Sequence, residues 1–206
     1  MAITSYATLK TAISDYAERP SGTAYYNQID TFIDLTEAGF NRSLRTQQME
    51  EEATVATNSS GVGTLPSDFL APRMMYRVAD PEHPLKWTTT AALRDMNPYR
   101  VAGVPEWAAV SGSTVQVEPI YEGNFTLQYF EKIPALDDAT TTNWLLDLAP
   151  DAYLFACLAH GEAFMQHPQE AAAYSSQVGP ILERLGLNDQ VARFAAAPLR
   201  IRGVTP

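Results

Sequence analysis

Histidine is scarce in this chain, and the three residues of that type are His83, His160 and His167. His160 and His167 are seven residues apart, or two helical turns, so they share a face only if one helix runs unbroken past both. Together with Glu162 or Glu170 they could then hold a metal ion for a small metal-dependent hydrolase. The spacing matches neither HExxH nor a comparable pattern, so a histidine pair at a helix end is the simpler interpretation.

Cysteine offers a second kind of chemistry, because the single Cys157 precedes His160 by three residues. A thiol and an imidazole can act as nucleophile and base when they lie within hydrogen-bond reach. Cys157, however, falls on the apolar face of an expected helix, where cysteine usually serves as a small buried hydrophobe. One cysteine also excludes an internal disulfide framework and a cysteine-based zinc site. Gly61-Val62-Gly63 lacks the remainder of a phosphate-binding loop, and we expect no enzyme.

The 206 residues carry a formal net charge of -10. Such a surface does not bind duplex DNA by its general charge, because that binding depends on neutralising phosphates. Residues 131–183 contain eight acidic residues and one basic residue, whereas residues 190–206 contain three arginines and no acidic residue. The C-terminal stretch therefore differs electrostatically from the body. No run approaches the roughly 20 apolar residues of a membrane span, and the first residues do not resemble a signal peptide.

The elements that must position these residues are mainly helical. Apolar residues at helical spacing predict four helices, over 4–18, 24–48, 150–166 and 168–195. On the second helix we expect the polar side to carry Asp30, Asp34, Glu37, Asn41 and Arg45. Gly39 on the same helix suggests the close approach of another backbone. Gly179-Pro180 should kink or break the last helix.

The intervening residues 50–135 predict a small, mostly antiparallel β insert. Strand candidates and turn clusters alternate there, and residues 114–118 and 125–129 show the period of two that buries one face of a strand. We expect Trp87, Trp107 and Tyr121 to belong to the insert's own small core. The alternative is that the insert projects outward and offers these aromatic side chains to a partner.

The expected fold class is therefore α+β and mainly α. It is a helical bundle of two N-terminal and two C-terminal helices, with a small antiparallel β insert and an extended C-terminal tail. The expected boundaries are 1–49 and 136–196 for the bundle, 50–135 for the insert and 197–206 for the tail.

The tail alternates apolar and basic residues and cannot bury its aliphatic side chains by itself. Such a segment can order on a partner, where aliphatic side chains fill pockets and arginines pair with carboxylates. The alternative is a frayed terminus. The candidate docking residues are Arg193, Leu199, Arg200, Ile201, Arg202 and Val204.

Residues 29–45, IDTFIDLTEAGFNRSLR, resemble the IxxFIxLAExxxNRxLR segment of tailed-bacteriophage head-to-tail adaptor (connector) proteins, and Met49-Glu50 follows as in that family. Further similar segments occur in the family's order, at 3–10, 65–70, 129–136, 143–146, 150–155 and 198–202. Together the matches span nearly the whole chain. Two features depart from the family pattern: Thr36 and Gly39 replace the usual Ala and Arg, and Gly179-Pro180 interrupts the last helix.

This resemblance implies a structural virion protein of the phage neck, assembled in the host cytoplasm, with no enzymatic activity, cofactor or membrane partner. Twelve copies would form a ring beneath the portal protein and extend the DNA channel, through which DNA passes without specific binding. A downstream tail or nozzle protein would dock on the ring. The candidate docking residues would then contact the portal, and an acidic channel wall would repel the DNA backbone.

Two other hypotheses remain open at this point. One is the metal-dependent hydrolase built on His160 and His167, which metal analysis of the purified protein would distinguish. The other is a cytoplasmic adaptor of bacterial origin, encoded in a prophage remnant and absent from the virion, which the protein composition of the particle would distinguish.

Overall fold

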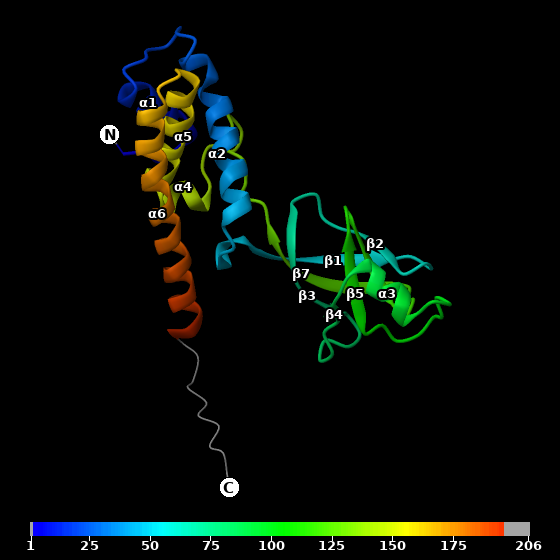
Figure 1. The fold of residues 1–206 in the computed structure, drawn as a ribbon. Coiled ribbons are helices and arrows are strands. Elements are labelled where there is room, and N and C mark those ends of the chain that lie inside the picture. Colours follow the sequence, from blue (N-terminus) through cyan, green and yellow to red (C-terminus); the bar gives the residue numbers. More distant parts are fainter. Residues whose placement is uncertain (1, 196–206) are drawn as a thin grey trace. The chain divides into compact units, whose positions relative to one another are not determined.

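The computed structural model describes residues 2–195, and these residues form two compact units (Figure 1). The helical unit contains residues 2–48 and 133–195, and the β unit contains residues 49–132. The β unit is therefore inserted into the chain of the helical unit. Each unit has its own buried apolar residues.

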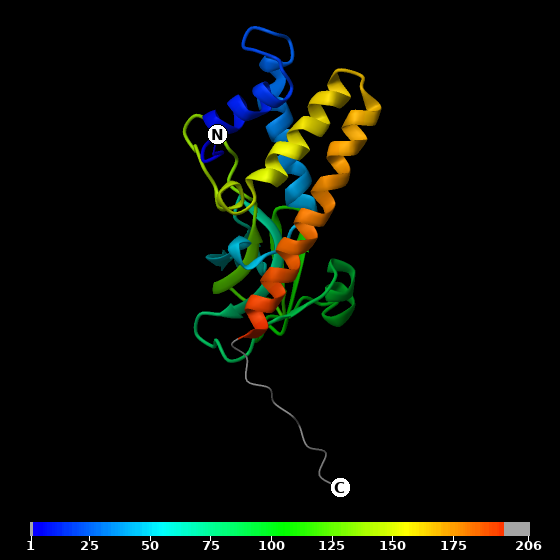
Figure 2. The same ribbon diagram turned by 90° about the vertical axis from the view of Figure 1, so that its left-hand side faces the viewer.

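The helical unit is organised around one central helix. Its elements are α1 (Tyr6–Tyr16), η1 (Tyr26–Gln28), α2 (Ile29–Ser43), η2 (Gln47–Met49), α4 (Trp144–Leu148), α5 (Pro150–Phe164) and α6 (Pro168–Ala195). α5 contacts α1, α2, α4 and α6, and buried residues occur around most of its circumference. A helix that is apolar on all sides belongs in the middle of a bundle. The views in Figures 1 and 2 agree that α2, α5 and α6 lie side by side.

α1 begins where its sequence provides a cap. The Ser5 side chain accepts a hydrogen bond from the Thr8 amide while the Thr8 hydroxyl accepts one from the Ser5 amide, which is a reciprocal capping box. The buried face of α1 carries Leu9 and Ile13. Pro180 lies inside α6, yet that helix continues from Pro168 to Ala195, so the expected break is absent.

The β unit is a curled, seven-stranded mixed sheet. Its elements are β1 (Glu50–Thr57), β2 (Val62–Thr64), β3 (Phe69–Arg77), β4 (Lys86–Trp87), α3 (Thr90–Met96), β5 (Trp107–Ser111), β6 (Thr114–Glu118) and β7 (Gly123–Glu131). The strand order is β3-β7-β1-β2-β6-β5-β4, and β4 pairs with β5 in parallel. The sheet curls until its two ends meet: the Leu85 amide donates to the Met75 carbonyl at 2.7 Å, and the Trp87 indole donates to the Arg73 carbonyl at 3.2 Å.

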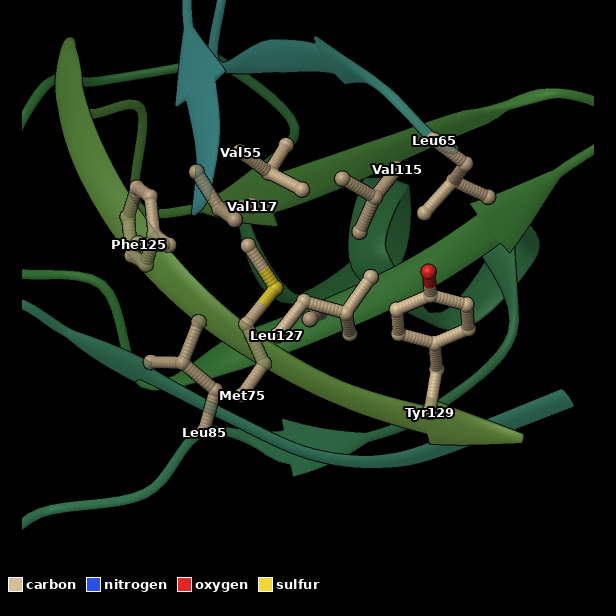
Figure 3. Packing of buried hydrophobic residues seen from close by; sticks show 10 residues of the cluster. Val55, Leu65, Met75, Leu85, Val115, Val117, Phe125, Leu127 and Tyr129 are labelled. Carbon is tan, nitrogen blue, oxygen red and sulfur yellow. The ribbon is translucent and has the colours of Figure 1, made fainter. Parts of the chain in front are cut away.

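The curled sheet encloses an apolar core (Figure 3). Alternate residues of each strand point inward, as the two-residue period requires. The buried cluster consists of Val55, Leu65, Met75, Leu85, Ala108, Val115, Val117, Phe125, Leu127 and Tyr129. Trp87 and Tyr121 pack against this cluster, whereas Trp107 lies beneath the Lys86 ammonium, 5.0 Å from its ring centroid.

The expected fold class, a mainly α bundle with a small antiparallel insert, is wrong. Strands account for 23% of the described residues and helices for 44%, and the strands form one curled mixed sheet rather than a minor appendage. The sequence pattern failed because β4 has two residues and β2 has three, which is too few for a period of two to be recognised. The parallel pairing of β4 with β5 depends on the crossover through α3, which local spacing does not reveal.

Gly161 on α5 permits a close approach by Tyr25. A Cβ atom at position 161 would lie 2.1 Å from the Tyr25 hydroxyl oxygen and 2.6 Å from Cζ. The Tyr25 ring is buried and packs edge-on against Phe32, with 5.3 Å between ring centroids. The backbone approach expected at Gly39 is absent, because a Cβ atom there would meet only the far end of the Arg42 side chain, at 4.0 Å.

We expect Gly161→Ala to lower the free energy of unfolding by about 2 kcal/mol, because overpacking a buried site displaces its neighbours. The matched control is Gly186→Ala on α6, where an added Cβ atom meets nothing within 4 Å. That substitution should stabilise the helix by up to about 1 kcal/mol. Urea denaturation monitored by circular dichroism measures both, and equal midpoints for the two variants would contradict the packing argument.

Candidate assembly site

A buried carboxylate organises the helical unit. Glu37 on α2 is 4% exposed, and its Oε1 accepts hydrogen bonds from the Leu136 amide at 3.0 Å and the Tyr153 hydroxyl at 3.1 Å. The Asn143 side-chain amide donates to the Tyr153 oxygen and to the Pro134 carbonyl, both at 2.8 Å. This network ties α2, the segment that returns from the β unit, and α5 to one another.

A second side chain on α2 holds the same returning segment. The Asn41 side-chain oxygen accepts a hydrogen bond from the Ile133 amide at 2.8 Å. Glu37 and Asn41 are four residues apart, so they lie on one face of α2, one turn apart. The expectation that Glu37 belongs to a polar outer face is wrong, because hydropathy cannot reveal a carboxylate whose hydrogen bonds are formed internally.

Burial raises the pKa of Glu37 to about 7. The hydrogen bonds from Leu136 and Tyr153 act in the opposite direction, and the nearby Asp34 and Asp137 carboxylates add to the increase. Loss of hydration disfavours the charged form more than two neutral donors favour it. The protonated carboxyl group is therefore stabilised in the folded unit.

The Cys157 thiol is not arranged as a nucleophile. It is fully buried on α5, and its hydrogen-bonding neighbour is the Thr36 hydroxyl at 3.5 Å rather than an imidazole. Burial raises the pKa of Cys157 to about 12. Since the thiolate is the reactive form, this cysteine acts as a packing residue.

The structure separates the two C-terminal histidines. His160 lies on α5 and is half-buried, and burial lowers its pKa. α5 ends at Phe164 and α6 begins at Pro168, so His167 lies in the turn, where its Nδ1 is 2.8 Å from Glu162 Oε2. No single helix therefore runs past both His160 and His167. Within residues 2–195, no group of three or more His, Cys, Asp or Glu is placed to hold a metal ion.

Among the candidate docking residues, the described part of the chain includes Arg193 on α6. Its Nε lies 2.8 Å from Asp189 Oδ2, and Asp189 Oδ1 accepts a hydrogen bond from the Gln47 amide at 2.8 Å. Arg193 therefore helps to fix α6 against η2. The other candidates lie outside the described residues: Leu199, Arg200, Ile201, Arg202 and Val204.

An apolar surface surrounds the C-terminal half of α6. Leu148, Leu187 and Val191 are 56%, 60% and 67% exposed. A groove of about 220 Å³ lies between η2, α4 and α6, with Trp144 and Leu185 among its lining residues. Sequence reasoning missed this surface because α6 carries its apolar residues on more than one side. Separately, none of the described helices combines the length and apolarity of a membrane span.

The Glu37 carboxyl group should make stability depend on pH. Its folded-state pKa of about 7 exceeds the ordinary value of 4.5, so its contribution is complete below pH 4.5 and is lost as pH rises through 7. The shift corresponds to about 3 kcal/mol of unfolding free energy between pH 4 and pH 8. Chemical denaturation at both pH values measures this change.

Glu37→Gln should flatten that dependence, because the glutamine carbonyl can still accept both hydrogen bonds and does not ionise. The matched control is Asp15→Asn, which removes an exposed carboxylate on α1 that is not among the groups acting on the Glu37 pKa, so the pH dependence due to Glu37 should remain. An unaltered slope in Glu37→Gln would show that the loss of stability originates elsewhere.

Comparisons with known proteins agree with the resemblance seen in the short sequence segments. No curated protein sequence matches the chain significantly. The model of a protein family described as SU10 adaptor protein matches residues 4–202, which is nearly the whole chain. A match of this extent includes both compact units and the candidate docking residues up to Arg202. The chain therefore belongs to the SU10 adaptor protein family, a family of phage head-to-tail adaptors.

Proposed function

We propose that this protein forms a ring of twelve copies in the neck of a tailed phage, between the portal protein and the tail. The observation that carries the proposal is the family match over residues 4–202. The family implies a virion component of the neck that associates with portal and tail proteins. In this proposal the protein performs no chemistry, it assembles in the host cytoplasm, and its mechanism is ordered assembly.

Residues 197–206 are the proposed portal-docking segment. They follow the long helix α6, whose C-terminal half already displays exposed Leu187 and Val191. Leu199, Ile201 and Val204 would fill apolar pockets on the portal, while Arg200 and Arg202 would pair with its carboxylates. Arg193, already paired with Asp189, would hold the base of the segment rather than contact the portal first.

The proposed ring extends the DNA channel with an acidic wall. Residues 1–48 and 133–195 carry 13 acidic and six basic side chains, and residues 49–132 carry 11 acidic and six basic side chains. Both units are therefore negatively charged, and either could face the duplex. A negative wall repels phosphates, so DNA would slide past without being retained. Subunit contacts in such a ring are heterologous, with one flank of each copy meeting the opposite flank of the next.

Deleting residues 197–206 should leave a folded, soluble protein that no longer binds the portal ring, because the truncated chain retains residues 2–195 with the buried apolar residues of both compact units. Pull-down with purified portal measures binding, and circular dichroism confirms that the truncated protein is folded. Undiminished portal binding by the truncated chain would refute the docking role of this segment.

Leu199→Asp and Ile201→Asp should each weaken portal binding about tenfold or more, since a buried aliphatic anchor typically contributes at least 1–2 kcal/mol. Thr205→Asp is the matched control, because it adds the same charge to the same segment at a residue outside the docking set. Equal losses for all three variants would indicate a general charge effect instead of apolar docking.

A further inference from the structure

One loop of the β unit displays apolar side chains to solvent. Within residues 96–104, here termed the anchor loop, Tyr99 is 90% exposed and Val101 and Val104 are each 62% exposed. Met96 at its start is half-exposed as well. Exposed apolar side chains gathered in one short segment are typical of interaction surfaces, and tyrosine is among the residues that contribute most at such surfaces.

Side-chain hydrogen bonds hold the anchor loop in a fixed shape. The Asn97 side chain both donates to the Val101 carbonyl and accepts from the Val101 amide, each at 2.9 Å. The same Asn97 donates to Glu118, which is buried, at 2.6 Å, and the Arg100 guanidinium donates to the Ser60 carbonyl at 2.7 Å. A loop with this much internal bonding pays little ordering entropy when a partner binds.

The backbone adds two further restraints to the anchor loop. The Gly103 amide donates to the Ile120 carbonyl at 3.0 Å, and Ala102 forms a parallel bridge with Ile120. Arg100 has a φ of +51°, a left-handed conformation that a non-glycine residue adopts only where its surroundings impose it. These bonds restrain the backbone on both sides of Tyr99, while the Tyr99 and Val101 side chains stay exposed to solvent.

The charge of the anchor loop and its flanks is opposite to that of the chain. Residues 84–105 contain Lys86, Arg94 and Arg100 against one acidic residue, Asp95, while the whole chain has a net charge of -10. Arg100 is paired with the Glu118 carboxylate at 3.5 Å, so Lys86 and Arg94 carry the positive charge that remains for a partner. A basic and apolar surface complements an acidic one. A second copy of this chain presents an acidic surface, so it is a partner of complementary charge.

The acidic surface lies at the opposite end of β1. Glu51 pairs with Tyr129 at the start of that strand, close to Glu131 and Asp68. Burial raises the pKa of Glu131, and the nearby Glu51 and Asp68 carboxylates raise it further, so these groups repel one another. A guanidinium from outside would relieve that repulsion.

The anchor loop is tied to the other end of the same strand. The Arg100 guanidinium of the loop donates to the carbonyl of Ser60, which follows β1. Ile120, which bonds to Gly103 of the loop, lies three residues before Gly123, and Gly123 pairs with Thr57 at the end of β1. Eight strand residues span about 25 Å. Complementary surfaces at opposite ends of one unit are what a heterologous, ring-forming contact requires.

We propose that the anchor loop of one copy docks on the acidic end of β1 in the next copy, with Tyr99 and Val101 as apolar anchors and Arg94 facing Glu51. The contact between two copies is argued from the β unit alone. Only the closure of successive contacts into a ring rests on the proposed function.

Cysteine cross-linking in the full-length protein tests the contact directly. The native Cys157 is buried, so it gives little background. A mixture of Val101→Cys and Glu51→Cys proteins should form disulfide-linked dimers, and the double variant should form a ladder of higher multimers. The matched control replaces Val101→Cys by Val78→Cys, an apolar residue of similar exposure (55%) outside the loop. Equal cross-linking with the control, or dimers from Val101→Cys alone, would overturn the head-to-tail contact.

Substitutions test the energetics by sedimentation velocity over a range of concentrations, with and without portal. Tyr99→Ser should weaken self-association about tenfold or more, whereas Tyr16→Ser, an exposed tyrosine of the helical unit, should not. Arg94→Glu and Glu51→Arg should each weaken self-association, and the variant that carries both substitutions should recover it. Absence of that restoration, with both single variants folded, would refute the proposed pairing.

The two proposals fail separately. If the double cysteine variant forms the cross-linked ladder but the wild-type chain does not bind portal, the anchor-loop contact stands and the adaptor function fails. If the chain binds portal but Val101→Cys and Glu51→Cys do not cross-link in the bound state, the adaptor function stands and the anchor-loop contact is wrong. If the anchor loop instead docks on a tail protein, the chain would bind portal without cross-linking between copies. The Tyr99→Ser variant would then lose binding to the tail protein and keep binding to portal.

Discussion

The hydrogen bonds of the buried Glu37 carboxyl group are the constraint on which the helical unit depends. The β unit interrupts this unit between α2 and α4, so the chain must be brought back to the place it left. Glu37 and Asn41 do this by receiving the Leu136 and Ile133 amides. Both residues belong to the segment that identifies the family, whose pattern ExxxN thereby acquires a physical meaning: it closes the unit after an insertion of more than 80 residues.

The sequence predicted the long helices well, because their apolar residues recur at helical spacing and α5 in particular is apolar on most sides. It misplaced Glu37, since a charged residue in a helix is normally assigned to solvent and only tertiary contacts show otherwise. It also misread Gly39 as the point of close approach. That role belongs to Gly161, where the approaching group is a tyrosine ring from a distant part of the chain.

The sheet and the candidate site were less predictable, for different reasons. The curled closure depends on Leu85 and Met75 meeting across the ends of the sheet, a contact that no local pattern encodes. Of the docking residues, Arg193 proved to have a partner in Asp189, and the remainder lie beyond the described part of the chain. The anchor loop was overlooked because Met96, Tyr99, Val101 and Val104 are spaced irregularly, and their shared exposure follows from how Asn97 and Glu118 shape the backbone.

The unequal lengths of α5 and α6 have a mechanical consequence. α6 has 28 residues and its antiparallel neighbour has 15. At 1.5 Å per residue, α6 extends about 20 Å farther along the pair. Figures 1 and 2 show it continuing past the other helices of its unit. Asp189 near its end bonds to the Gln47 amide and to Arg193, so the extension is braced against η2 and is not a free arm.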